Sequence, residues 1–495
     1  MKRPLIPVVA ALALSLSLSA CAVGPNYVKP ASTPARDGTF VDPAAARADA
    51  VTPAPVPAGT WWRLFDDPVL DRLIADALAH NADVREAAAN VRKARALLSE
   101  AKTDRLPTTN LSGGYTRNRI GLGAAVAQGA IGGTTPAPGG PSHIDYDFYQ
   151  TGIDASYEVD LFGRVSRSVE AARGEWVATE ADLDAARIAV AAETARTYAT
   201  ACASAEQAHV ARETAELQGR TLDLTRRLYD GGRGTQRDID QANVLAQQAL
   251  AQVPTFEADR RAALYALAAL TGRPPREFDQ QAAQCTVTPR VTTAIPIGDG
   301  AALLARRPDV RAAERRLAAQ TARIGVATAA LFPKITLGGN ATLGAQRPGD
   351  LGKASSFGFS LGPLISWSFP NISVARSRIR QERAETEAAL ARFDGTVLTA
   401  LTEAESALAR YSGALDSDAA LTSAAASAEN AARLSRVRFD AGRDSFLQLL
   451  DAERARASSR AALAEARAAL TEAQVGLFAA LGGGWEEAAQ AEKAK

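Results

Sequence analysis

The chain has 495 residues and a formal net charge of +1, with apolar residues at 47% of positions and aromatic residues at only 6%. This composition favours a folded protein of more than one ordinary domain, and the near-zero charge does not favour nucleic acid or a strongly acidic partner. The three histidines are scattered, and the sequence contains no metal-ligand spacing and no motif that sets a nucleophile beside a base. We therefore predict that the protein is not an enzyme and holds no metal or other catalytic cofactor.

The N-terminus has the three parts of a secretory leader. A short basic start precedes an apolar run over residues 5–18, which is too short to span a membrane as a helix. Residues 18–21 resemble the bacterial lipobox, which implies cleavage before Cys21 and attachment of a diacylglycerol thioether and an N-acyl group to it. The alternative is an ordinary secretory signal with a chance cysteine. Ala22 stands where an aspartate would favour inner-membrane retention, so the resemblance points to the outer membrane.

The rest of the chain contains an internal duplication. Residues 83–85 recur at 309–311, and residues 229–233 align with 439–443. Several such matches in the same order predict two copies of one structural unit. The expected parts are a signal peptide at 1–20, a lipid-anchored segment at 21–65, a first repeat at 66–290, a second repeat at 291–485 and a C-terminal tail at 486–495.

Each repeat contains two segments in which apolar and polar residues alternate with a period of two. The clearest runs from Tyr149 to Leu161. Strands of about ten residues with one apolar and one polar face are typical of a membrane β-barrel, which must be closed to satisfy its backbone. Four strands cannot close, so we expect three chains to share a barrel of twelve; a half-buried sheet in a soluble domain is the alternative. The expected strands are about 107–118, 147–161, 333–344 and 356–369.

Three carboxylates fall on the polar side of the best strand: Asp154, Glu158 and Asp160. In a trimer each would form a ring of three charges facing the lumen, and acidic rings favour cations. The alternative is that they are ordinary wetted residues of a wide lumen.

Two long stretches, 165–229 and 374–439, are rich in Ala, Arg, Glu and Leu and contain no proline. They exceed the length of an ordinary globular helix and predict coiled coils. We expect each to fold back once into an antiparallel hairpin, with tips near 203–207 and 411–417. A soluble helical bundle is the alternative.

Shorter helices should follow the two long stretches. Including them, the helical hairpins are expected to span about 165–271 and 373–481. The glycines at 231, 232 and 234 and Gly442 break the helices, and we expect them to mark a belt at mid-height of the helical part.

Two further cysteines, Cys202 and Cys285, remain after Cys21. We favour two packed, unpaired thiols, because free cysteines are commonly buried as small apolar residues. A disulfide between them stays open as the alternative in an oxidising compartment.

Four stretches in order carry a family resemblance: the start 21–27, the tryptophan-rich stretch 61–70, the stretch 303–310 and the ending 477–485. They resemble the TolC-like outer membrane factors, and most closely the lipid-anchored efflux lipoproteins of the NodT type. The resemblance spans nearly the whole chain after the leader.

That resemblance implies a mixed α and β membrane protein. Three chains would form a twelve-stranded outer-membrane β-barrel, continued by a long periplasmic helical barrel of coiled coils. It also implies two partners, a periplasmic adaptor and an inner-membrane transporter of the resistance-nodulation-division type, and a periplasmic gate that closes like an iris. The gate residues suggested by position alone are Arg410, Tyr411, Asp416 and Asp418.

These expectations combine into one function, the passive exit duct of a tripartite efflux pump. Two alternatives stay open: the outer-membrane duct of a type I protein-secretion system, and a structural coiled-coil lipoprotein. Fold alone does not separate the first alternative from efflux.

Overall fold

The computed structural model describes residues 22–30, 50–52, 59–121, 142–298, 300–367, 369 and 372–483. The predicted lipid site, Cys21, lies outside them. The chain divides into two compact units: unit 1 takes Met1–Val28, Ala94–Trp176 and Arg316–Ala389, and unit 2 takes Lys29–Lys93, Val177–Arg315 and Leu390–Lys495. The α-helices are α2 (Pro68–His80), α3 (Ala82–Thr103), α5 (Arg164–Asp230), α6 (Gln236–Leu270), α7 (Gly300–Arg306), α8 (Pro308–Ala329), α9 (Ile372–Asp440) and α10 (Phe446–Ala480).

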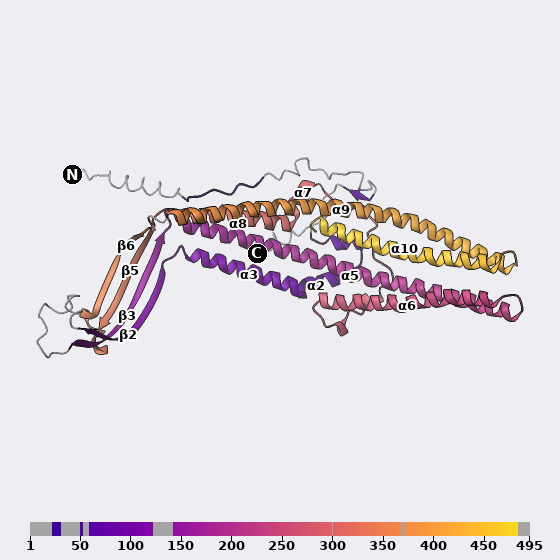
Figure 1. Cartoon of the computed structure of the whole chain (residues 1–495), viewed down its shortest axis with the longest axis horizontal. Coiled ribbons are helices and arrows are strands. Elements are labelled where there is room, and N and C mark those ends of the chain that lie inside the picture. Colours follow the sequence, from indigo (N-terminus) through magenta and orange to yellow (C-terminus); the bar gives the residue numbers. More distant parts are fainter. Residues whose placement is uncertain are drawn as a thin grey trace. The chain divides into compact units, whose positions relative to one another are not determined.

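Unit 1 contains an antiparallel sheet of four strands in the order β2-β3-β5-β6 (Figure 1). Each repeat supplies one pair of sequence neighbours, and β3 then pairs with β5 across the two repeats. Alternating β-branched and aromatic residues favour such a pleated surface. All four expected strands are present, as β2 (Thr108–Gly121), β3 (His143–Val159), β5 (Lys334–Ala345) and β6 (Phe357–Ser366).

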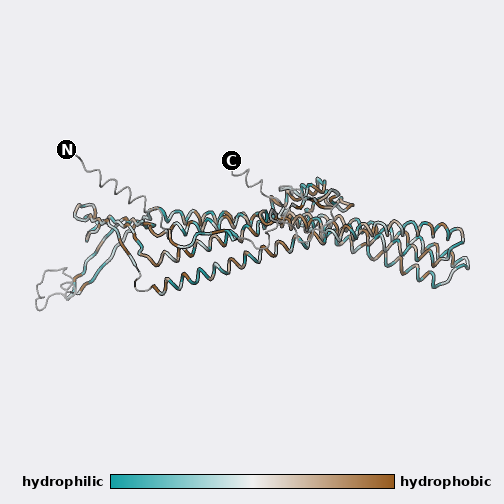
Figure 2. The backbone as a smooth tube through the Cα atoms, turned by 90° about the horizontal axis from the view of Figure 1, so that it is seen from above, coloured by the Kyte–Doolittle hydropathy of each residue, from teal (hydrophilic) through white to brown (hydrophobic). Residues whose placement is uncertain are grey.

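The helices α5 and α9 are longer than expected. They have 67 and 69 residues and run without a break through 203–207 and 411–417, so the predicted hairpin tips were wrong. Isolated glycines such as Gly219 and Gly413 cost a helix only about 1 kcal/mol each, which does not suffice to fold it back. Figure 2 shows hydrophilic and hydrophobic residues interspersed along these helices. Within the described part of the chain, none of the helices combines the length and the apolar run that crossing a bilayer requires.

The reversals occur instead at the glycine-containing sequences after α5 and α9. Gly232 and Gly442 both have φ +69°, and in both turns the amides of that glycine and of the next residue donate back to carbonyls in the last helical turn. This pattern ends a helix because glycine accepts the left-handed conformation. Thr235 and Ser445 then start α6 and α10 with capping boxes. The prediction that these glycines mark a mid-height belt was therefore wrong; they form the hairpin turns.

Unit 2 has an aromatic core where the short helix η3 (Trp61–Phe65) meets the end of α10. Trp61 is fully buried, and its ring stacks on Phe478 with 5.0 Å between ring centroids. The hydroxyl of Tyr198 donates to Asp67 Oδ2 at 2.9 Å, while Oδ1 accepts two backbone amides at the start of α2. Burial, followed by the Asp67 charge, raises the pKa of the Tyr198 hydroxyl. A small parallel pair, β1 (Val51–Thr52) with β4 (Ile295–Pro296), also lies in this unit.

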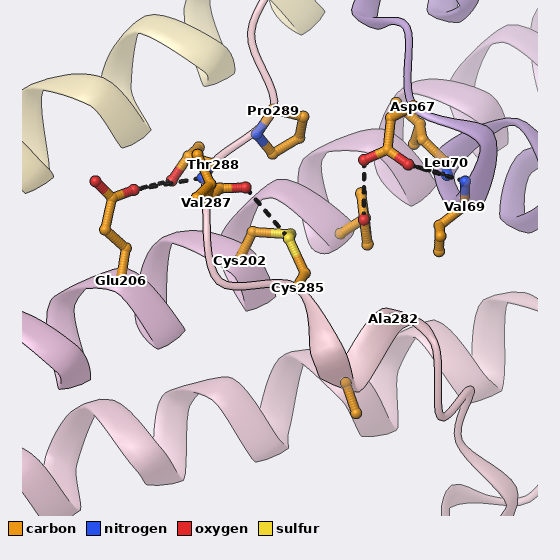
Figure 3. Close-up of a disulfide and its surroundings, with 12 residues drawn as sticks. Asp67, Val69, Leu70, Cys202, Glu206, Ala282, Cys285, Val287, Thr288 and Pro289 are labelled. Atoms are coloured by element: carbon orange, nitrogen blue, oxygen red, sulfur yellow. Dashed lines mark hydrogen bonds between the residues drawn. A yellow bond between two sulfur atoms is a disulfide. The ribbon is translucent and has the colours of Figure 1, made fainter.

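Cys202 and Cys285 form a disulfide with 5.1 Å between their Cα atoms, so the preference for two free thiols was wrong (Figure 3). Cys202 lies on α5 within unit 2. Cys285 lies in residues 271–298, which follow α6 and are called here the crossover segment. The two positions are 83 residues apart in sequence, and only packing of the crossover segment against α5 brings them within bonding reach.

Residues 22–28 pack against other parts of unit 1. The amide of Val23 donates to the carbonyl of Phe162 at 3.2 Å. Gly24 has φ +95°, and a Cβ at this position would lie 2.5 Å from Gly325 Cα. The close approach of two glycine backbones therefore holds the start of the described chain against α8.

We predict that Gly24→Ala releases this segment. The new Cβ would overlap the Gly325 backbone, and a left-handed conformation costs an L-residue about 1–2 kcal/mol. Hydrogen exchange at the Val23 amide should accelerate about tenfold or more. Gly219→Ala is the matched control, because among the described residues no atom outside the adjacent turns of α5 lies within 4 Å of its added Cβ. The substitution should stabilise α5 by up to about 1 kcal/mol. Unchanged exchange at Val23 in Gly24→Ala would show that the contact does not hold the segment.

Candidate functional site

The sheet of unit 1 has one polar face. Residues paired across neighbouring strands point to the same side, and one row reads Asn110, Asp154, Asn340 and Ser360. The rows on either side of it along the strands, on the same face, contain only Ser, Thr and Gly. Asp154 is exposed there, and its two cross-strand neighbours are the side-chain amides of Asn110 and Asn340.

The opposite face of the sheet is apolar. Its rows include Leu111, Ile153, Ala341 and Phe359, and Leu111 and Phe359 are 78% and 75% exposed in the single chain. An exposed apolar band of this extent is unfavourable in water and marks a surface that meets lipid or another protein.

The sheet has two open edges. Among the described residues, β2 pairs only with β3, and β6 pairs only with β5. Each edge carries a row of backbone donors and acceptors that a neighbouring strand can satisfy. The sheet therefore needs further strands from outside this chain before it can lie in lipid.

The second feature of interest is a polar seam between the two helical hairpins, α5–α6 and α9–α10, close to their turns. Arg436 of α9 donates to Glu453 Oε1 of α10 at 3.1 Å and to Thr221 Oγ1 of α5 at 3.4 Å. Glu453 is 2% exposed, and its other oxygen lies 3.0 Å from Arg456. Gln218 is also buried here. Buried ions are stable only when paired in this way.

A family model described as outer membrane efflux protein matches residues 73–273 and 301–483, well over half of the chain. The chain belongs to the outer membrane efflux protein family.

Individual relatives are similar to this chain over nearly its full length. The outer membrane protein OprJ of Pseudomonas aeruginosa is 30% identical over 98% of both chains. Nodulation protein T of Rhizobium leguminosarum bv. trifolii is 29% identical over 96% of this chain and 97% of its own. Among solved structures, the outer-membrane channel OprN is 33% identical with a TM-score of 0.84 over 94% of this chain and 100% of its own.

These findings confirm the resemblance to TolC-like outer membrane factors, including NodT-type members. They also confirm the expected fold, in which three chains contribute four strands each to one outer-membrane barrel above a periplasmic helical barrel. The protein is the outer-membrane channel subunit of an efflux pump and is not an enzyme. Its two open strand edges are therefore protomer boundaries in the barrel.

Within this channel, the three predicted lumen carboxylates do not share one role. Asp154 alone is an exposed charge on the polar face. Glu158 receives two hydrogen bonds from Arg164, at 2.6 and 2.7 Å, and lies 2.9 Å from Lys334. Asp160 lies beyond the end of β3 and accepts the backbone amides of Val165 and Ser166 at the start of α5. Glu158 and Asp160 are thus local ion-pair and capping groups rather than free lumen charges.

The predicted gate residues lie in the middle of α9 and not at a hairpin tip, because the turn begins only after Asp440. Tyr411 is 4% exposed and belongs to the same apolar cluster as Trp61 and Phe478. Arg410 and Asp416 are exposed and Asp418 is half-buried. The positional reason for choosing these residues was therefore wrong. Sequence reasoning did not identify the polar seam, because Arg436 and Glu453 resemble the many other charged residues of these helices.

The crossover segment is fixed to the helices of unit 2 by further polar contacts. Arg72 of α2 donates to both oxygens of Asp279, at 2.6 and 3.0 Å, and this hydrogen bonding lowers the pKa of the carboxyl. Among the described residues, no group of three or more His, Cys, Asp or Glu side chains could hold a metal ion.

We predict that Tyr411 acts in the core of the channel and not in its gate. Tyr411→Ala should destabilise each chain by about 3–5 kcal/mol, the usual cost of truncating a buried aromatic residue, and lower the melting temperature of the detergent-solubilised trimer. The neighbouring Arg410→Ala, at an exposed position, is the matched control and should change it little. An unchanged melting temperature together with increased conductance in Tyr411→Ala would indicate that this residue acts in the gate after all.

Proposed function

We propose that the protein is a lipid-anchored duct for small molecules. It would receive them from a periplasmic adaptor and an inner-membrane transporter of the resistance-nodulation-division type and conduct them passively to the exterior. The observation that carries the proposal is the four-stranded sheet with one polar face, one apolar face and two open edges. In a closed barrel that sheet lines a water-filled path and performs no bond chemistry.

The packing of the N-terminal segment supports an anchor at Cys21. Ala22 lies so close to Gly163 that a Cβ on that glycine would be 2.7 Å from the Ala22 Cα. Arg167, which is 5% exposed, donates to Asn26 Oδ1 at 2.7 Å. Acyl chains on Cys21 would therefore start one residue from a fixed point beside the first turn of α5. They would add to the membrane affinity of the barrel.

The exposed carboxylate of Asp154 supports a cation preference. Three copies would place a ring of three charges in the lumen, next to side-chain amides that carry no opposing charge.

The polar seam supports a gate near the hairpin turns. Arg436 of α9 is joined to Thr221 of α5 by a hydrogen bond, which water can replace when the two hairpins separate. We therefore place the iris at this seam, in place of the residues near 411–417. Arg410, Asp416 and Asp418 remain secondary gate candidates at exposed or half-buried positions of α9.

The alternative function is a duct for type I protein secretion, which uses the same fold. Ducts of that class commonly lack a lipid anchor, so the lipobox ending at Cys21 favours small-molecule efflux. The anchor is tested directly with Cys21→Ala, which should lose lipid incorporation. The readout is mass spectrometry of the mature N-terminus.

The duct and its gate are tested together. Protein extracted from outer membranes in mild detergent should have the mass of a trimer and give discrete currents in a planar bilayer. Thr221→Val should raise the open probability, because it removes the hydrogen bond by which Arg436 of α9 is joined to α5 of the other hairpin. Glu429→Gln, which changes a more exposed partner of Arg456, is the control and should have a smaller effect. If both variants were folded monomers that gave no current, a duct shared by three chains would be refuted.

The charge ring is tested by the reversal potential of open channels in a salt gradient. Asp154→Asn should lower the cation-to-anion permeability ratio severalfold. Asn340→Asp, which adds a carboxylate in the same cross-strand row, should raise it. An equal ratio in the wild type and both variants would show that the lumen at this row is too wide for its charges to select.

A further inference from the structure

The disulfide between Cys202 and Cys285 lies at the base of the first helical hairpin. The loop it closes contains the remainder of α5, the glycine turn and all of α6. By the alignment of residues 229–233 with 439–443, the position matching Cys202 in the second repeat is Ser412. The duplicated hairpin α9–α10 therefore has no cysteine at the corresponding place, so the bond distinguishes one repeat from the other.

Noncovalent contacts hold the crossover segment on the C-terminal side of the bond. The Thr288 hydroxyl donates to Glu206 at 2.9 Å, one helical turn along α5 from Cys202 (Figure 3). The amide of Val291 donates to Gln474 Oε1 at 3.0 Å, and Gln474 Nε2 donates back to the Val291 carbonyl at 2.8 Å. Thus α5 and α10 are both joined to the same short stretch of chain.

A contact also holds the segment on the N-terminal side of the bond, where Arg72 of α2 binds Asp279 through two hydrogen bonds. Between these contacts, Ala282 and Cys202 are buried in the same apolar cluster. The disulfide is therefore the central attachment in a series that joins the crossover segment to α2, α5 and α10.

The two cysteine residues differ in burial. Cys202 is fully buried, whereas Cys285 is only half-buried. A thiolate reductant would reach the less buried residue first, so it would bond to the sulfur of Cys285 and expel the Cys202 thiolate. That thiolate would form in an apolar cluster, where charge is disfavoured. Reduction should therefore be slow until the crossover segment has moved away from α5.

We propose that Cys202 and Cys285 are an oxidative maturation site, and that their bond is a permanent clamp which holds the crossover segment across the base of the α5–α6 hairpin. The oxidant is of the disulfide-donating class found in oxidising compartments. The two thiols lose two electrons and two protons in total, and the oxidant's disulfide takes them up and leaves as a dithiol. The bond is a structural fixture of the folded channel rather than a switch.

The first experiment measures the redox state of the full-length trimer, purified from membranes without reductant and treated with a maleimide. No alkylation at either residue is expected, even after denaturation, and two alkylated residues are expected once the denatured protein is reduced. Dithiothreitol should reduce the folded trimer at least about tenfold more slowly than the denatured chain. Free thiols in the purified protein would refute the maturation site, and equal rates would refute the buried leaving group.

The second experiment measures the clamp by hydrogen exchange in Cys202→Ala/Cys285→Ala. The amides of Cys285, Thr288 and Val291 should exchange at least about tenfold faster than in the wild type. Peptides from α9 and α10 near their turn, where no disulfide exists, are the internal control and should be unchanged. Unaltered exchange in the crossover segment would overturn the clamp.

If the double variant does not accumulate as a trimer, the wild-type trimer supplies the test. It is reduced in mild denaturant, alkylated with iodoacetamide and returned to native buffer, and the same amides are compared with an unreduced sample carried through identical steps. Faster exchange confined to the crossover segment supports the clamp. Identical exchange in the two samples refutes it without depending on the variant.

Discussion

The two unpaired edges of the four-stranded sheet constrain every other part of this protein. A strand edge in lipid leaves backbone donors and acceptors without partners, at a cost of several kcal/mol for each group. β2 and β6 carry such edges, and the apolar rows between them are unsuited to water. The chain can satisfy both requirements only by joining its edges to those of other copies. Trimerisation therefore completes the membrane part by pairing these edges.

The helical part meets a different requirement, which is the length of its helices. Each repeat contains a helix of nearly seventy residues and a shorter return helix, and the transition between them is made by a left-handed glycine followed by a capping box. The seam between the hairpins near these turns contains the hydrogen bond from Arg436 to Thr221 and a small apolar cluster around Leu222. The core around Trp61 and Phe478 is larger and rich in aromatic residues. The interior therefore changes along the helices, from a large apolar core to a smaller contact region that also contains buried polar groups.

The crossover segment shows how the duplicated chain departs from its own symmetry. Both repeats have the same order of elements, yet the disulfide closes the first hairpin alone, since the position matching Cys202 in the second repeat is Ser412. Side chains of both hairpins bind the connecting chain. Duplication supplies two equivalent hairpins, and these local substitutions make them inequivalent. This difference comes from a few side chains and not from the backbone topology.

The sequence was sufficient to predict the four strands, the duplication, the long helices and the family. These features repeat over many residues, so a period of two or a run of helix formers identifies them without reference to the rest of the chain. It did not determine where the long helices reverse, because several isolated glycines were available and only the turns after Asp230 and Asp440 combine a left-handed glycine with a new cap. It also could not assign Glu158, Asp160 or Tyr411, whose partners are Arg164, the start of α5 and a distant aromatic core. Tertiary structure alone decided these, and also the bond between Cys202 and Cys285, because each depends on which segments far apart in the chain come within a few ångströms.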